Sequence, residues 1–163
     1  MWQDDRALEL TVAEIRSLRP HEGIDRVAVG CVGFRPGRLG HELLVLRRAP
    51  GLSFGGIEEL PSGGVEPGET LAQAVVREME EEIGVTGVQP GPMLFEFSYD
   101  SPKGHTIQFN FMFVLGDQRI ALSPEHVSSR WLPVSRLAAS DLTPAVQVGV
   151  RKSMARGLTQ LRR

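Results

Sequence analysis

The sequence predicts an α/β (α+β) sandwich in which helices cover a curved mixed β-sheet. Strand-like runs recur along the chain, one clearly capped helix separates them into two groups, and another helical pattern closes the chain. With 163 residues, of which 41% are hydrophobic and 23% are charged, the chain has the size and composition of one globular domain. We therefore expect one sheet with helices packed on it.

The first elements are a short helix and two strands. Residues 6–18 carry apolar side chains at helical spacing, and a proline follows them. Residues 26–34 and 41–48 are apolar runs separated by the turn-rich stretch RPGRLG, which is typical of two strands. Glycine and proline dominate residues 50–68, where only 57–60 could form a short strand.

A helix over residues 70–83 has the clearest boundaries in the chain. Thr70 and Gln73 have the spacing of a capping box at its start. Gly84 can adopt the left-handed conformation that ends a helix. The sequence therefore predicts both ends of this helix.

The remainder predicts a hairpin, a short strand and a closing helix. Residues 93–100 and 105–116 are β-like runs around the turn SPKG. A short strand is expected within 128–134, and a helix over 144–161.

Charge and cysteine content exclude several classes of function. The formal net charge is −2, so no global attraction to nucleic acid or anionic lipid is expected, and the basic C-terminal residues are best explained as a solvated helix face. The single cysteine, Cys31, excludes an intramolecular disulfide and lies in an apolar run typical of a buried thiol. We expect no signal peptide or membrane span, and a cytoplasmic protein.

The helix at 70–83 concentrates four glutamates in five positions. At about 100° per residue, Glu78, Glu81 and Glu82 fall within about 100° of arc, whereas Glu80 faces away from them. Glu82 falls at the edge of the apolar stripe, where an unpaired carboxylate is costly. The cluster is either a solvated acidic face or a site for a hard cation such as Mg²⁺ or Mn²⁺, and its geometry favours the cation site.

The stretch GGVEPGETLAQAVVREMEEEIGV, from Gly63 to Val85, resembles a complete Nudix box, the motif of the Nudix hydrolases. The motif consists of Gly, five residues, Glu, seven residues and then Arg-Glu-apolar-x-Glu-Glu-x-Gly-apolar, and every specified position matches. One departure lies just outside it, where Ser62 stands in place of a glycine found in many members. We expect this substitution to change the turn little. The resemblance implies a Nudix-type α/β/α hydrolase domain over 24–163, and the leading helix lies outside it, so we expect an N-terminal helical extension over 1–23.

The resemblance also implies roles for individual residues. Glu78, Glu81 and Glu82, with the backbone carbonyl of Gly63, would hold Mg²⁺ or Mn²⁺. Arg77 would pair with Glu69 and hold the loop and helix in register. The implied reaction is hydrolysis of a nucleoside diphosphate linked to another group, for which the cation neutralises phosphate oxygens and activates water.

A general base is expected from outside the box. We predict Glu125, because it lies six residues before Trp131, a spacing that resembles the MutT-type members. The catalytic set is then Glu125, Glu81, Arg77 and Glu69. Glu96 and Asp100 are weaker candidates for the base, and we interpret His105 and His126 as structural or surface residues.

Residues after the box resemble the MutT-type pattern, which favours a nucleoside triphosphate, including modified ones, as substrate. Members that act on oxidised guanine nucleotides often carry Pro-x-Asn near the last helix, whereas this chain has Pro144-Ala145-Val146 followed by Gln147. Specificity for 8-oxo-guanine is therefore not expected from Val146, although Gln147 could substitute. Phe54 could stack on a base, whereas Phe109, Phe111 and Phe113 alternate along one strand face and are better explained by core packing.

Two other functions stay open. One is hydrolysis of a nucleotide sugar of the ADP-ribose type, and the other is a non-catalytic module that senses a nucleotide. The box carboxylates and Arg77 are all present, which argues against the non-catalytic module. The expected partner is a small nucleotide, with no nucleic acid and no membrane, and the leading helix either packs on the domain or forms a homodimer contact.

Overall fold

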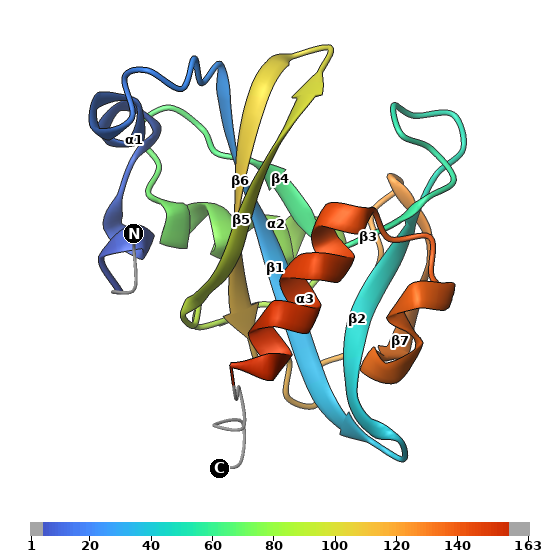
Figure 1. Ribbon diagram of the computed structural model, residues 1–163. Helices are drawn as coiled ribbons and strands as arrows, with labels where there is room; N and C mark the ends of the chain where they lie inside the picture. The colour runs from blue at the N-terminus through green and yellow to red at the C-terminus, as the bar shows by residue number, and fades with distance from the viewer. Residues whose placement is uncertain (1–4, 157–163) are drawn as a thin grey trace.

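The computed structural model describes residues 5–156, which form a mixed sheet between two layers of helices (Figure 1). The elements follow one another along the chain as η1 Asp5–Glu9, α1 Val12–Leu18, β1 Arg26–Gly37, β2 Gly40–Arg48, β3 Glu58–Glu59, β4 Ser62–Gly64, α2 Leu71–Ile83, β5 Met93–Ser101, β6 Gly104–Phe113, β7 His126–Pro133, η2 Val134–Ala139 and α3 Pro144–Ala155. None of the helices in this described part is long and apolar enough to cross a membrane.

The sheet has the path β3-β2-β1-β6-β5, with β4 paired to β1 and β7 paired to β2. The β1–β6 pair is parallel and every other pair is antiparallel, so the predicted mixed sheet is confirmed. β1 is long enough to pair with β4 and β6 through its first half and with β2 through its second half. This division of partners places β4, which precedes α2, beside the start of β1.

Each face of the sheet has its own apolar core. One core packs α2, η1 and α1 against the sheet and contains the thiol of Cys31, whose burial raises its pKa. The other packs η2 and α3 against the opposite face (Figure 1). The side chains of Phe109, Phe111 and Phe113 are buried in the first core, which confirms their predicted packing role.

The leading helical segment differs from the prediction. Instead of one helix over 6–18, the chain forms the 3-10 helix η1 and the α-helix α1, which meet at Thr11. Thr11 caps α1 through a reciprocal capping box with Glu14, so its backbone is extended and interrupts the helix. The nearby Leu10 carbonyl accepts a hydrogen bond from the Leu71 amide at 2.9 Å, and Ile15 is buried, so this segment packs on the domain.

Other boundaries shift by a few residues. The predicted strand over 105–116 ends at Phe113, and the expected helix over 144–161 is α3, which ends at Ala155, while residues 157–161 lie outside the described part. The short strand β4 was not predicted, because its sequence, Ser62-Gly63-Gly64, resembles a turn.

Candidate functional site

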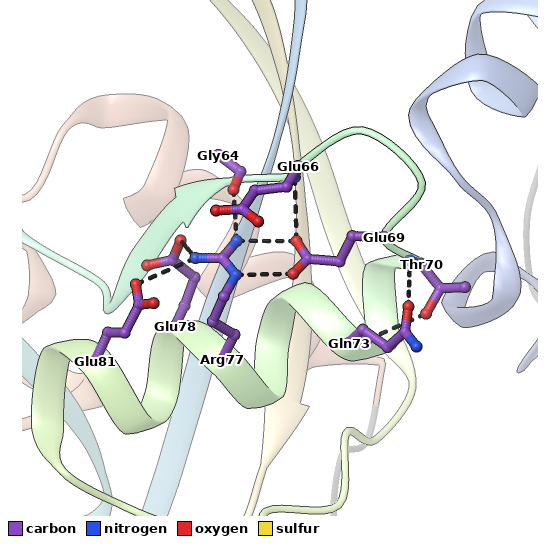
Figure 2. A network of polar contacts seen from close by, with 8 residues as sticks. All are labelled: Gly64, Glu66, Glu69, Thr70, Gln73, Arg77, Glu78 and Glu81. Carbon is purple, nitrogen blue, oxygen red and sulfur yellow. Dashed lines mark hydrogen bonds and ion pairs between the residues drawn. The ribbon is translucent and has the colours of Figure 1, made fainter.

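The loop after β4 is clamped to α2 by Arg77 (Figure 2). The Arg77 guanidinium donates to both carboxylate oxygens of Glu69, at 2.8 and 2.9 Å, and to the backbone carbonyl of Gly64 at 2.8 Å. These hydrogen bonds hold the pKa of Glu69 below its ordinary value. The predicted pairing of Arg77 with Glu69 is present, and it fixes the loop relative to the helix.

Arg77 also contacts two glutamates on its own helix. Its Nη1 lies 2.7 Å from Glu78 Oε1 and 3.2 Å from Glu81 Oε2 (Figure 2). The hydrogen bonds that Arg77 donates to Glu69 and Glu78 raise the pKa of Arg77, despite the opposing effect of its burial. Arg77 is the one basic residue of α2, and its guanidinium partly neutralises the negative charge of the carboxylate cluster.

The orientation of α2 follows from its caps and apolar stripe. Thr70 and Gln73 form the predicted capping box, and Gly84 has φ +67° in the left-handed region. The apolar side chains face the core, while Glu80 and Glu81 are exposed. Glu78 and Glu82 are buried, at 7% and 5% exposure, so the buried stripe extends further over the carboxylates than the helical projection predicted.

Glu82 is the most strongly perturbed carboxylate of the group. Its Oε2 accepts a hydrogen bond from the Ser62 amide at 2.9 Å. Burial raises the pKa of Glu82 to about 8, and the negative charges of Glu78, Glu59 and Glu125 add to this effect, while the Ser62 hydrogen bond opposes it. A carboxylate in this position is costly when ionised unless a cation compensates it.

Glu78 lies against the backbone of Gly63. A methyl group on the α-carbon of Gly63 would come within 2.0 Å of Glu78 Cδ, so only glycine leaves room for the carboxylate. Burial raises the pKa of Glu78, although the hydrogen bond from Arg77 lowers it. The backbone at Gly63 therefore lies directly against the buried Glu78 carboxylate.

The loop between β6 and β7 brings Glu125 to the same region. Backbone hydrogen bonds from Ala121 to the Ile83 carbonyl, at 2.8 Å, and from Ser123 to the Glu82 carbonyl, at 3.0 Å, attach this loop to the end of α2. The Glu125 side chain is 57% exposed, and its Oε2 lies 3.6 Å from Arg48 Nη1. Glu125 is thus a solvent-accessible carboxylate whose charge reaches Glu82.

The sequence did not predict that Arg48, Glu59 and His126 would lie together beside Glu125. Glu59 Oε1 lies 2.8 Å from His126 Nε2 and 3.3 Å from Arg48 Nη1. The His126 side chain is completely buried, so its interpretation as a structural residue agrees with its packing, and it fixes Glu59. No local motif marks these residues, because strand pairing of β2 with β3 and β7 brings them together.

The weaker candidates for a base have other partners. Glu96 Oε2 forms an ion pair with Arg19 at 2.8 Å. Asp100 Oδ1 lies 2.9 Å from His105 Nδ1 near the tip of the β5–β6 hairpin. Neither contributes to the charges that raise the pKa of Glu82 most, whereas Glu125 does.

Of the residues considered for base recognition, Val146 and Gln147 are engaged within the protein, whereas Phe54 is exposed. Val146 is buried in the core beneath α3, and Gln147 donates to the Leu142 carbonyl at 2.9 Å and accepts from Arg151 at 3.4 Å. Gln147 therefore supports the local structure of α3. Phe54 is 56% exposed in the loop between β2 and β3 and has a positive φ of 57°, which is uncommon for a non-glycine residue.

The donor set fits a hard divalent cation. Within residues 5–156, no three acidic, histidine or cysteine side chains already converge in a ready-formed cation site. Glu78 and Glu81 are held by Arg77, and Glu82 is held by Ser62. All are oxygen donors on one side of α2, and the two buried ones have raised pKa values, so a cation beside Gly63 would relieve an unfavourable charge arrangement.

Comparison with known proteins identifies the family. The NUDIX domain family model matches residues 25–153. An 8-oxo-dGTP diphosphatase of Escherichia coli is 32% identical over 112 residues, covering 69% of this chain and 85% of the relative. The NAD-capped RNA hydrolase NudC of Stutzerimonas stutzeri is 35% identical over 123 residues, which cover 75% of this chain but 40% of that protein.

Solved structures agree on the fold. The crystal structure of a MutT protein from Methanosarcina mazei superposes with a TM-score of 0.73 at 24% identity, covering 84% of this chain and 98% of that one. A Caenorhabditis elegans Ap4A hydrolase superposes with a TM-score of 0.69 at 22% identity, covering 80% and 96% of the two chains. With its Arg77-clamped carboxylate helix and its match to the family over most of its length, the chain belongs to the Nudix family and is a Nudix hydrolase.

Proposed function

We propose that the protein is a Mg²⁺-dependent pyrophosphohydrolase that cleaves the diphosphate of a nucleoside triphosphate, with modified nucleotides among its substrates. The burial of Glu78 and Glu82 beside Gly63, with raised pKa values for both carboxylates, carries this proposal. Such carboxylates are unfavourable for stability alone and suit a site completed by a cation.

Glu78, Glu81, Glu82 and the Gly63 carbonyl would hold Mg²⁺, with Mn²⁺ as a substitute. The bound cation supplies charge neutralisation of the phosphate oxygens and lowers the pKa of water. Arg77 and Glu69 keep the loop at a fixed distance from α2, so the Gly63 carbonyl and the helix carboxylates stay in one constellation. They act as positioning residues, because their side chains are occupied by each other.

Glu125 would serve as the general base. It is exposed, its loop is attached to the end of α2, and its contact with Arg48 is loose at 3.6 Å. Its carboxylate would accept a proton as water attacks one phosphorus of the substrate. The phosphoanhydride bond opposite the attacking water then breaks, and for a nucleoside triphosphate the products are a nucleoside monophosphate and pyrophosphate.

The triphosphate is favoured by the relative that is matched over most of its length, the 8-oxo-dGTP diphosphatase. The NUDIX domain of Shewanella oneidensis NrtR, solved in complex with ADP ribose, shares the fold with a TM-score of 0.64 at 18% identity. Hydrolysis of a nucleotide sugar is therefore the second activity to be tested.

The decisive experiment is a substrate panel with Mg²⁺, Mn²⁺ or a chelator, comprising ribo- and deoxynucleoside triphosphates, ADP-ribose and a dinucleoside polyphosphate. We expect cation-dependent release of nucleoside monophosphate and pyrophosphate, with turnover lost in Glu82→Gln but retained in Glu80→Gln. Reaction in ¹⁸O-labelled water identifies the phosphorus attacked. Turnover of ADP-ribose alone would replace the triphosphate proposal, and cation-dependent binding without turnover of any compound would indicate a nucleotide-sensing module.

A further inference from the structure

Two amide side chains on β6 are buried on the sheet face that α3 partly covers. Gln108 is 6% exposed, and Asn110 is fully buried. They are hydrogen-bonded to each other, with Gln108 Nε2 lying 2.9 Å from Asn110 Oδ1. Buried amides on a strand face otherwise suited to apolar packing are costly unless their polar atoms are used.

The partners of Asn110 set the orientation of both amides. Asn110 Nδ2 lies 3.2 Å from the Phe95 carbonyl and 3.4 Å from the Gln108 carbonyl, and because both are acceptors this atom must be the donor nitrogen. Asn110 Oδ1 therefore faces Gln108 and accepts from its Nε2. The remaining atom, Gln108 Oε1, is left as an acceptor with a fixed direction.

Gln108 Oε1 has no hydrogen-bond partner among residues 5–156. It is also not sealed inside the protein, since His126 Nδ1 is the only fully buried side-chain polar atom without a partner in the described part of the chain. An oriented acceptor on a largely buried side chain that still reaches solvent is suited to a ligand that donates a hydrogen bond.

Gly30 makes room for this arrangement. A methyl group on its α-carbon would lie 2.0 Å from Asn110 Oδ1 and 2.6 Å from Gln108 Nε2. The amides therefore lie close over the backbone of β1 at Gly30, and any side chain there would displace them.

The strand that carries the acceptor, β6, lies two strands away from β4, which contacts Glu82 through Ser62. Gly30 pairs with Asn110 on β6 and with Ser62 on β4, and the Ser62 amide donates to Glu82. Two strand spacings correspond to about 10 Å. This separation suits a nucleotide whose phosphates meet the metal-holding residues and whose base, one ribose further, lies over β6.

Aromatic rings flank the acceptor on β5. Phe97 pairs with Gln108 in the strand register, and its ring lies 6.3 Å from Phe95 and 5.8 Å from Tyr99. Phe97 and Phe95 are half-buried, and α3 packs against Phe95 through Gly149, where a methyl group would come within 2.2 Å of the ring. Figure 1 shows β5 and β6 continuing past α3, so the helix covers only part of this face of the sheet.

We propose that Gln108, oriented by Asn110, recognises the base of the nucleotide substrate by accepting a hydrogen bond from its amino group at Oε1, with the base ring against the aromatic side chains of β5. This proposal rests on the proposed function. It adds that the site selects a base by the amino group on its edge. It assigns to Gln108 the specificity role that Gln147 does not fulfil, since the Gln147 amide is occupied within α3. An acceptor at this position favours amino-substituted bases over keto analogues.

The test uses matched nucleotide pairs that differ at one amino position: ATP against ITP, CTP against UTP, and GTP against ITP. For wild-type protein we expect kcat/KM to favour the amino member of at least one pair by roughly tenfold, the size expected for one specific hydrogen bond. Gln108→Met keeps the length of the side chain but removes the acceptor, and we expect the ratio to fall close to one through a raised KM for the amino member. Gln147→Met is the matched control and should leave the ratio unchanged.

Gly30→Ala provides a second variant, in which Gln108 itself is not substituted. Its methyl group would displace both amides, so the same loss of discrimination is expected. Thermal unfolding of each variant shows whether the fold is retained, and binding of the nucleoside monophosphate products by calorimetry gives the base preference without turnover. Hydrolysis by the wild type with a preference between the members of each pair that Gln108→Met does not change would overturn the inference and leave the proposed function standing. Absence of hydrolysis in the wild type would overturn the proposed function instead.

Discussion

The α-carbon of Gly63 lies directly against the carboxyl group of Glu78, because a methyl group there would overlap Glu78 Cδ at 2.0 Å. This contact joins the strand-like start of the Nudix box to the helix that ends it. It makes the loop backbone and a buried carboxylate parts of one site.

Gly63→Ala tests this contact. We expect the methyl group to displace Glu78, to weaken cation binding and turnover, and to cost about 1–3 kcal/mol of stability, as overpacking does in a dense interior. Gly51→Ala is the matched control, since a methyl group on Gly51 would meet no atom within 4 Å and its φ is not in the left-handed region. Steady-state rates at several Mg²⁺ concentrations and urea unfolding measure the two effects, and equal behaviour of the two variants would contradict the packing argument.

Glu82→Gln should reduce turnover by orders of magnitude and leave the fold intact, because it removes a ligand charge while the amide oxygen can still accept from the Ser62 amide. Glu80→Gln is the control, since Glu80 is exposed on the far side of the same helix. Initial rates and circular dichroism of both variants check this prediction. A Glu82→Gln enzyme with near-normal rates would remove Glu82 from the site.

The raised pKa of Glu82 predicts a pH-dependent stability in the presence of a chelator. Between the ordinary carboxyl pKa and about 8, the folded protein holds a proton on Glu82 that the unfolded chain has lost. The unfolded state therefore binds fewer protons, and the free energy of unfolding falls as pH rises, by at most about 1.4 kcal/mol per pH unit for this one group. Urea unfolding from pH 5 to 8.5 should show this decline in wild type and a flatter profile in Glu82→Gln.

Added Mg²⁺ should counter the decline at high pH, because it binds the ionised carboxylates of the folded state. The same pH slope in wild type and Glu82→Gln would show that other groups cause the effect.

Arg77→Lys should lower activity by about 10- to 100-fold, the usual effect of losing a partner that orients metal ligands. Lysine keeps the charge but cannot donate to both Glu69 oxygens and the Gly64 carbonyl at once. Arg151→Lys, on the exposed surface of α3, is the control. We expect the Mg²⁺ titration of the rate to shift to higher Mg²⁺ concentrations in Arg77→Lys, and an unchanged Mg²⁺ titration would show that the clamp does not position the ligands.

Glu125→Gln should reduce kcat by about 10²-fold or more at neutral pH with little change in KM, as expected for loss of a general base. Glu96→Gln and Asp100→Asn are controls, because these carboxylates pair with Arg19 and His105 instead. Steady-state kcat and KM of the three variants at neutral pH check this prediction, and we expect the loss of kcat in Glu125→Gln alone. If kcat stays near normal in Glu125→Gln and falls in a Glu59→Gln variant, the base is Glu59.

The local features of the Nudix box could be predicted from the sequence. Helix periodicity and capping depend on residues three or four apart, so the caps of α2 and the outward direction of Glu80 follow from spacing alone. The same holds for Phe109, Phe111 and Phe113, because alternate residues of a strand share one face. The pairing of Arg77 with Glu69 came with the family motif, whose offsets contain both residues.

Only the tertiary structure decided how deeply the carboxylates are buried and what surrounds them. The burial of Glu78 and Glu82 depends on β4 and the loop after β6, which pack against α2 from distant parts of the chain. The contact of Glu59 with His126 and the free oxygen of Gln108 arise from strand pairing and from Gly30 on a neighbouring strand, for which no local spacing exists. The sequence by itself determined the family and the carboxylate motif of its helix, because these reside in short-range spacing. The electrostatic environment and the surface offered to a base required the fold, because they are set by residues that become neighbours only when the sheet is assembled.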